Sequence, residues 1–337
     1  MKLIELTPEA FEDFTSQQSC NNFLQSKEMF IRYQTTKREA YLLGVSDKHQ
    51  ILAAALVMKL QNLKGHKVFS APGGPILDYS SDNASEIISF FTKEIKKFLK
   101  AHKGSVFQIS PNVLYSDELT KVLTGLHFNT LGEYIQAKWI TARDFKGFSS
   151  KDEDKLLAIF RKTHRQNIRK AINRYHVEVR ELKRTEMDIL FKEVGKAAVK
   201  HSFVAQNRTY YEEMFDAFGE KIKVLAAFYE DKPIAAAMFI IYNKEVVYLY
   251  SGADPEYAHV YGSFAIQWHM LCYCLKHNIP RYNFFGTYPD ENNGVYQFKL
   301  GFRGVLEELQ GTFILPLDPL GHLFVARRKY QKYGKLS

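Results

Sequence analysis

Two kinds of hydrophobic pattern alternate along the first half of the chain. Apolar residues at helical spacing predict amphipathic helices, which cover residues 7–14, 22–34 and 84–102. Short apolar runs bounded by polar turns predict strands, which cover residues 41–45, 51–58, 67–71 and 105–109. Thr7 stands where an N-cap is expected, with Pro8 in the first helical position. This half therefore mixes helices and strands in an α/β (α+β) arrangement.

The second half of the chain repeats the first. An apolar hairpin around Ala235–Ala237 matches the one around Ala53–Ala55 almost position for position, and residues 126–136 align without gaps on residues 300–310. The remaining predicted elements are strands at 224–229, 233–241, 246–250 and 281–285 and a helix at 263–277. A repeat of this length indicates two copies of one mixed α/β unit and not a solenoid.

The composition is that of a globular protein with two domains. A chain of 337 residues is too long for one hydrophobic core, and its 46% hydrophobic content excludes general disorder. The formal net charge of +9 favours an anionic partner; nucleic acid, a nucleotide-linked precursor and an anionic membrane surface all remain open. Cys20, Cys272 and Cys274 lack C-x-x-C spacing, so neither a disulfide framework nor a zinc site is indicated.

The N-terminal pattern is not that of a secretion signal. Glu5, Glu9 and Glu12 interrupt it before an apolar signal-peptide core forms. The apolar runs near residues 53–58 and 235–242 have the length of strands and not of membrane-spanning helices. We therefore expect a cytoplasmic chain that makes at most peripheral contact with a membrane.

The segment between the two copies is strongly basic and predicts a helix over residues 160–174. Arg161, Arg165 and Arg169 recur at four-residue spacing, with Lys170 beside them. An apolar stripe on another face is formed by Leu156, Phe160, Ile168 and Ile172. Like charges at this spacing repel, so an anion such as RNA phosphate would stabilise the helix. A solvated basic face is the alternative interpretation.

The stretch from Arg281 to Gly304 is the second candidate site. Its pattern predicts a strand end, a polar loop and a short helix that carries Lys299 among aromatic residues. Partial burial there would restrain the ammonium and make its protonation depend on its surroundings. The matching position in the first copy is Gly125, so this candidate belongs to one half only. A lysine that extends along the edge of an aromatic core is the alternative.

The order and spacing of several short motifs resemble the Fem family of non-ribosomal peptidyltransferases. These enzymes move amino acids from aminoacyl-tRNA onto peptidoglycan precursors. The motifs cover nearly the whole chain and include LTPEAFEDFT at the N-terminus, Gly74–Tyr79, the basic helix, Tyr210–Tyr211, Tyr261–Trp268, Arg281–Gly286 and Phe298–Phe302. Each motif is short, but their combination is specific.

The resemblance implies two tandem domains similar to the acetyltransferase (GNAT) unit. Residues 1–143 with 312–337 would form the first, precursor-binding domain, and residues 144–311 the second, with the transfer site. The coiled-coil insertion of some relatives would follow Tyr211 and is absent, which implies the compact FemX-like form. Aminoacyl-tRNA and a UDP-linked or lipid-linked precursor would be the substrates, with no metal or other cofactor.

The resemblance also assigns roles to individual residues. Phe298 and Lys299 would lie at the transfer site, where the ammonium stabilises an oxyanion or protonates the departing ribose oxygen. Substrate would contact Arg32, Tyr33, Gln206, Arg208, Tyr210 and Tyr211. Independently of the resemblance, Tyr250 and Tyr257 are candidates to line the acceptor groove, with an aromatic-rich sheet edge as the alternative. The RNA would contact Arg161, Arg165, Arg169 and Lys170.

Four positions depart from the family pattern. Tyr33 stands where relatives tend to have Lys, Gln206 and Gly73 where Arg is expected, and Ser110 where Asp is expected. Several of these positions contribute to precursor binding in relatives. A changed or lost precursor specificity therefore remains open.

Two rival functions remain. A GNAT-like N-acyltransferase using another acyl donor, such as acyl-CoA, would need a glycine-rich pyrophosphate loop. The corresponding residues His259–Phe264 carry Phe264 where a minimal side chain is needed, which argues against it. A Fem-like binding protein that has lost activity would explain the departures at Tyr33, Gln206 and Ser110.

Overall fold

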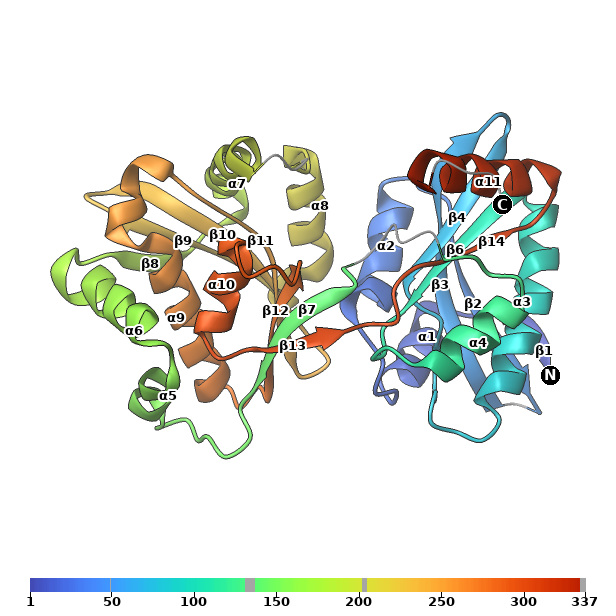
Figure 1. Cartoon of the computed structure of the whole chain (residues 1–337), viewed down its shortest axis with the longest axis horizontal. Helices are drawn as coiled ribbons and strands as arrows, with labels where there is room; N and C mark the ends of the chain where they lie inside the picture. The colour runs from blue at the N-terminus through green and yellow to red at the C-terminus, as the bar shows by residue number, and fades with distance from the viewer. Residues whose placement is uncertain (49, 131–136, 202–204, 334–337) are drawn as a thin grey trace. The chain divides into compact units, whose positions relative to one another are not determined.

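The computed structural model describes residues 1–48, 50–130, 137–201 and 205–333 (Figure 1). The chain forms two compact units, Met1–Lys138 with Glu308–Ser337 and Trp139–Glu307. The boundaries expected from the sequence, 143/144 and 311/312, fall a few residues later, because strand β7 (Trp139–Asp144) pairs within the second unit. Residues 131–136 of the aligned repeat lie outside the described residues.

The first unit is built on a sheet of order β1-β2-β3-β4-β6-β14, with β5 paired to β3. Its strands are Lys2–Glu5 (β1), Ala40–Asp47 (β2), Gln50–Leu63 (β3), His66–Gly73 (β4), Ile76–Leu77 (β5), Gly104–Pro111 (β6) and Phe313–Pro316 (β14). Its α-helices are Pro8–Thr15 (α1), Lys27–Thr35 (α2), Ala84–Ala101 (α3), Asp117–Gly125 (α4) and Pro319–Tyr333 (α11). Among the described strands of this unit, only the β4–β6 pair is parallel, and α3 connects these two strands. The apolar face of α3 packs on the sheet and forms the core of the unit.

The second unit has a sheet of order β13-β7-β12-β11-β10-β9-β8. Besides β7, its strands are Glu178–Glu181 (β8), Ile222–Tyr229 (β9), Lys232–Tyr242 (β10), Glu245–Ala253 (β11), Arg281–Thr287 (β12) and Val305–Glu308 (β13). Its α-helices are Glu153–Ile159 (α5), Lys162–Arg169 (α6), Met187–His201 (α7), Arg208–Phe218 (α8), Gly262–Lys276 (α9) and Gly294–Gly301 (α10). The parallel pair is β11–β12, connected by α9, which packs on β9 and β10.

The two sheets share one strand order but exchange a strand. β7 follows the first unit in sequence yet pairs with β12 of the second unit. β14 follows the second unit in sequence yet pairs with β6 of the first. Each sheet is therefore completed by a strand from the other half of the chain.

Two helices expected from the sequence are interrupted. The helix expected at 22–34 is a short 3₁₀ turn, Phe23–Gln25, followed by α2, because the Ser26 hydroxyl accepts a hydrogen bond from the Met29 N–H (3.2 Å) and caps a new helix. The helix expected at 160–174 is α6 followed by a π-helical segment, Lys170–Arg174 (η2). The wider π turn moves Ile172 off the apolar stripe, and its side chain is 40% exposed.

The two units differ where their parallel strands meet. In the first unit β4 and β6 stay paired from Lys67 to Gly73. In the second unit, pairing of β11 with β12 ends at Val247 and Asn283. Beyond this point β12 bulges at Phe285, whose φ is +60° and whose N–H donates to the Asn283 side chain (2.7 Å). The second sheet therefore opens between two strands that remain joined in the first.

Arg281, at the start of β12, ties four strands together. Its guanidinium donates to Glu245 (2.9 Å), Asp144 (3.1 Å) and Glu307 (2.6 Å), which lie on β11, β7 and β13. These carboxylates raise the pKa of Arg281 against the opposing effect of desolvation. The cluster closes the paired end of β12, opposite the opening.

Replacing Arg281 with Met is expected to lower the free energy of unfolding by about 3 kcal/mol, because carboxylates in a partly buried cluster lose their counter-charge. Urea denaturation measures the change. Arg180→Met is the matched control, since Arg180 pairs with Glu186 at an exposed site and its loss is expected to leave the free energy of unfolding nearly unchanged. Equal losses in the two variants would contradict a structural role for the Arg281 cluster.

Candidate active site

A cavity of about 600 Å³ lies where β11 and β12 separate. Residues 248–253 of β11 form one wall, and Phe285 and Gly286 of β12 form another. The N-terminal turn of α9 and the helix α10 complete it, and α10 contributes Phe298 and Lys299. The strand opening thus creates the cavity, and the short helix expected after β12 delivers the lysine into it.

Lys299 is almost fully buried, with a relative exposure of 6%. Its ammonium donates to the carbonyl oxygens of Phe285 (3.4 Å) and Gly286, which the bulge in β12 turns toward it. Among the described residues, no carboxylate forms an ion pair with it. Desolvation lowers the pKa of Lys299 to about 7. Both protonation states are therefore populated near neutral pH.

His164 on α6 fixes the position of α10, and sequence reasoning did not single it out. Its imidazole Nε2–H donates to the Phe298 carbonyl (2.9 Å), and its ring packs against Phe264, Phe298 and Phe302. Burial lowers the pKa of His164, which favours this neutral donor form. A Cβ at Gly301 would lie 1.9 Å from the ring, so α10 approaches α6 through a glycine. The basic helix thereby holds the lysine-bearing helix.

Four of the expected substrate-binding tyrosines come together at the cavity or beside it. Tyr250 and Tyr257 line the cavity. The Tyr250 hydroxyl donates to the Tyr210 hydroxyl (3.2 Å), and the Tyr211 ring packs on Tyr250 at 5.3 Å between centroids. Tyr211 is fully buried, and desolvation raises its pKa to about 12. Tyr210 and Tyr211 thus support the cavity wall from α8.

The other two residues expected near these tyrosines do not line the cavity. Arg208 forms ion pairs with Asp188 (2.9 Å) and Glu212 (2.7 Å), which neutralise its charge. Gln206 is exposed just before α8. The ion pair with Asp188 could not be found from the sequence, because Asp188 lies on a different helix, α7.

Arg32 and Tyr33 lie in the first unit, on α2, and both are buried. Their exposures are 3% and 4%, and the guanidinium of Arg32 lies 5.7 Å from the Tyr33 ring centre. Both side chains are therefore part of the interior of this unit, and their contact with substrate stays a prediction.

Gly73 and Ser110, two residues that depart from the family pattern, form one turn of the first unit. The Ser110 hydroxyl accepts a hydrogen bond from the Gly73 N–H (3.0 Å). Gly73 has a φ of +76°, and a Cβ there would lie 2.3 Å from the Asn22 side-chain oxygen. An arginine does not fit at position 73, so this departure reflects local packing.

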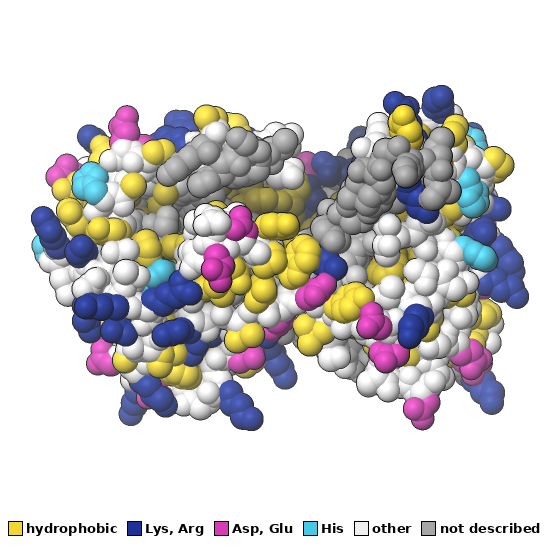
Figure 2. Space-filling view, in the orientation of Figure 1, with side chains coloured by type: hydrophobic (Ala, Val, Ile, Leu, Met, Phe, Trp, Pro, Cys, Tyr) yellow, Lys and Arg dark blue, Asp and Glu magenta, His cyan; other side chains and the backbone are white. Residues whose placement is uncertain are grey.

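The basic segment is only partly available to an anion. Arg161 donates to the Gln297 side chain (2.7 Å), and Arg165 donates to the carbonyls of Ala158 and Phe160 at the end of α5. Arg169 and Lys170 are exposed. In Figure 2, Lys and Arg side chains gather over α5 and α6, among hydrophobic ones. The structure thus divides the four expected contacts into two with internal partners and two at the surface.

Asp254 is the one carboxylate that lines the cavity among the described residues. Lys196 donates to it at 2.6 Å, as does the N–H of Glu256 at 3.0 Å. These bonds lower the pKa of Asp254. The carboxylate is therefore held as an anion by its own neighbours.

In the described ranges no helix is both long and apolar enough to cross a membrane.

The sequence profile of the FemAB family matches residues 6–230 and 225–327. The chain belongs to the FemAB family. Aminoacyltransferase FemB of Staphylococcus epidermidis is 26% identical over 406 residues, which cover 94% of this chain and 95% of FemB. The crystal structure of FemX superposes with a TM-score of 0.81 at 17% identity, covering 99% of this chain and all of FemX. A tandem GNAT protein from the clavulanic acid biosynthesis pathway gives a TM-score of 0.57 at 8% identity, covering 94% of this chain and 99% of that protein.

These comparisons confirm the expected fold and class. The FemAB chain has two tandem GNAT-like units, and it is an acyltransferase. The compact form is also confirmed, because α8 ends at Phe218 and β9 begins at Ile222, with no coiled-coil arm between them.

Proposed function

We propose that this FemAB protein transfers an amino acid from aminoacyl-tRNA to an amine of a peptidoglycan precursor peptide. The observation that carries the proposal is a buried lysine, Lys299, with a pKa lowered to about 7, in the cavity between β11 and β12. The aminoacyltransferase activity in the name of FemB supports the choice of acyl group.

The reaction joins an amine to an ester carbonyl. The amine attacks the carbonyl carbon, a tetrahedral oxyanion forms, and the bond to the ribose oxygen breaks; the amine loses a proton and the ribose hydroxyl gains one. The Lys299 ammonium stabilises the oxyanion and gives a proton to the ribose oxygen, and the proton released by the attacking amine restores the ammonium. Because the ester is already activated, the reaction as proposed needs no metal or other cofactor.

In this proposal, different residues bind the reacting groups, the tRNA and the precursor. Phe298, Tyr250 and Tyr257 shape the cavity that holds the reacting groups. The exposed Arg169 and Lys170 bind tRNA phosphates through an interaction that weakens with salt. The acceptor is a UDP-linked or lipid-linked precursor, bound with the help of the first unit, and any membrane contact is peripheral.

The rate of transfer is expected to fall as pH rises through about 7, because the acting species is the ammonium and its pKa is lowered to about 7. The rate of single-turnover transfer, measured at a series of pH values with precursor in excess, shows whether this decrease occurs. A rate that keeps rising well above pH 7 would show that the neutral amine acts instead.

An acyl-CoA donor is the second candidate, because the N-terminal turn of α9 lines the cavity as the pyrophosphate loop of a GNAT enzyme would. Phe264 in this turn packs on Phe298 (5.0 Å) and His164 (5.1 Å), which leaves a bulky group where close backbone approach is needed. Tight binding of acetyl-CoA in calorimetry would favour this candidate.

The deciding experiment incubates the protein with a set of charged tRNAs and soluble precursor and analyses the products by mass spectrometry. A precursor heavier by one amino acid supports the proposal. Binding of precursor or RNA without any product would instead support a FemAB protein that has kept the fold and lost the reaction.

A further inference from the structure

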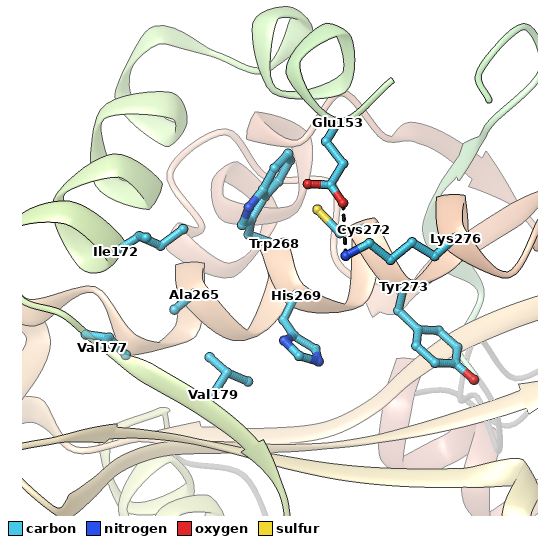
Figure 3. A pocket seen from close by; sticks show the side chains of 10 residues that line it. All are labelled: Glu153, Ile172, Val177, Val179, Ala265, Trp268, His269, Cys272, Tyr273 and Lys276. Atoms are coloured by element: carbon cyan, nitrogen blue, oxygen red, sulfur yellow. Dashed lines mark ion pairs between the residues drawn. The ribbon is translucent and has the colours of Figure 1, made fainter. Parts of the chain in front are cut away.

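A second cavity, of about 410 Å³, lies in the same unit beside the basic segment (Figure 3). It is bounded by α5, η2, β8 and α9. One side is apolar and is formed by Ile172, Val177, Val179, Ala265 and Trp268. The other end carries polar groups: His269, Tyr273 and the ion pair of Glu153 with Lys276 (3.2 Å). None of these residues lines the transfer cavity.

The apolar side is suited to a flat ring. The indole of Trp268 is held edge-on against the buried Phe160 ring, at 6.2 Å between centroids and 86° between planes. In Figure 3 the indole stands between Ile172 and Glu153, so an apolar surface and a carboxylate lie on either side of it. A planar heterocycle stacks on indole and on branched aliphatic groups.

The polar end is suited to the edge of a base. Desolvation and the charge of Lys276 lower the pKa of His269, so its neutral ring offers one donor and one acceptor. Glu153 accepts hydrogen bonds, and Lys276 donates them. Donors and acceptors are thus both present, as the mixed edges of nucleobases require.

The charges beside the cavity are suited to phosphates. Ile172 belongs to η2, and the exposed cations Arg169, Lys170 and Arg174 lie in this segment or immediately before it. In the part of the chain that the structure describes, none of the three forms an ion pair with a carboxylate. A polyanion that lies along this segment would place a side group at Ile172.

We propose that this cavity binds one unpaired base of an RNA strand, which stacks on Trp268 while the flanking phosphates lie along Arg169, Lys170 and Arg174. The inference rests on the proposed function for its RNA substrate. It adds a second contact, because α9 supplies Gly262–Phe264 to the transfer cavity and Ala265–Lys276 to this one. A base held here would anchor the strand away from the reacting ester.

Tryptophan fluorescence tests the proposal in the full chain. Trp139 is the other tryptophan, so Trp139→Phe leaves Trp268 as the sole reporter. We expect a single-stranded RNA of about eight nucleotides that carries no amino acid to quench the fluorescence of Trp268. An abasic strand of the same length should bind roughly tenfold more weakly and should not quench it. Equal binding of the abasic strand would overturn the proposal. Equally tight binding of adenosine monophosphate would also overturn it, since that result indicates a site for free nucleotides.

Two variants locate the contact. Ile172→Glu, at a half-exposed site, is expected to weaken binding of the intact strand roughly tenfold, whereas Leu60→Glu, at a similarly exposed site in the first unit, leaves it unchanged. Arg169→Ala is expected to reduce the slope of log affinity against log salt by about one, and Lys100→Ala leaves the slope unchanged. Unchanged binding by Ile172→Glu would overturn the inference.

The test separates this inference from the proposed function. Lys299→Met is expected to remove transfer but to keep RNA binding and the Trp268 signal. RNA that binds as described, with no transfer from any charged tRNA, contradicts only the proposed function. Transfer that proceeds while the abasic and intact strands bind alike contradicts only the base site.

Discussion

Lys299→Met is expected to lower the single-turnover rate of aminoacyl transfer by roughly 10²- to 10⁴-fold. Methionine has a similar length and no charge, so the cavity keeps its shape but loses its only proton donor to the ribose oxygen in the proposed mechanism. Lys192→Met, which removes an exposed lysine from α7, is the matched control and should keep the full rate. Transfer that survives in Lys299→Met would show that the lysine has a structural role only.

Measuring the stability of Lys299→Met shows whether its loss of transfer activity comes from unfolding. Burial lowers the pKa of Lys299 to about 7 from its ordinary value of 10.5, so between these pH values the unfolded chain binds more protons, and the wild type gains stability as pH rises. The methionine variant lacks this gain. Its free energy of unfolding relative to wild type should therefore be most favourable below pH 7 and decline toward pH 10.5, as urea denaturation at several pH values measures.

Gly301→Ala is expected to destabilise the protein by about 2–3 kcal/mol, because the new methyl group would meet the His164 ring at 1.9 Å. The clash should also shift α10 and with it Lys299, so transfer should fall in parallel. Thermal or urea unfolding measures the first effect and the single-turnover assay the second. Gly125→Ala is the matched control, since Gly125 also ends a short helix, α4, and a Cβ there meets nothing within 4 Å.

A double-mutant cycle shows whether His164 is the residue that excludes a side chain at position 301. His164→Ala alone should destabilise by about 2–4 kcal/mol and leave room for the new methyl group. The combined variant should then be more stable than the sum of the two losses predicts, by at least about 1 kcal/mol. Strictly additive losses would mean that the clash at Gly301 is relieved elsewhere.

Much of the fold followed from hydrophobic spacing. Strands and amphipathic helices with one buried face, such as α3, were predicted because their pattern is local and regular. The duplication followed from comparing one half of the chain with the other. The breaks at Ser26 and at Lys170 were missed, because one serine cap and one π-helical turn interrupt an otherwise continuous pattern.

The candidate site was only partly predictable. Lys299 stood out as a lone cation among aromatic residues, and the first copy has no lysine at the matching position. His164 did not, because its partners Phe298 and Gly301 are more than a hundred residues away in sequence and no local pattern connects them. The neutralisation of Arg208 and the burial of Arg32 were likewise invisible, since they depend on tertiary contacts.

The exchange of β7 and β14 has a consequence for biosynthesis. β6, buried along its whole length, has one neighbour, β14, that leaves the ribosome only after the entire second unit. Until then the nascent first unit displays an open strand edge, a state prone to pairing with other chains. The first unit is therefore completed only after the second unit has been synthesised, and a chaperone that shields the β6 edge would raise the yield.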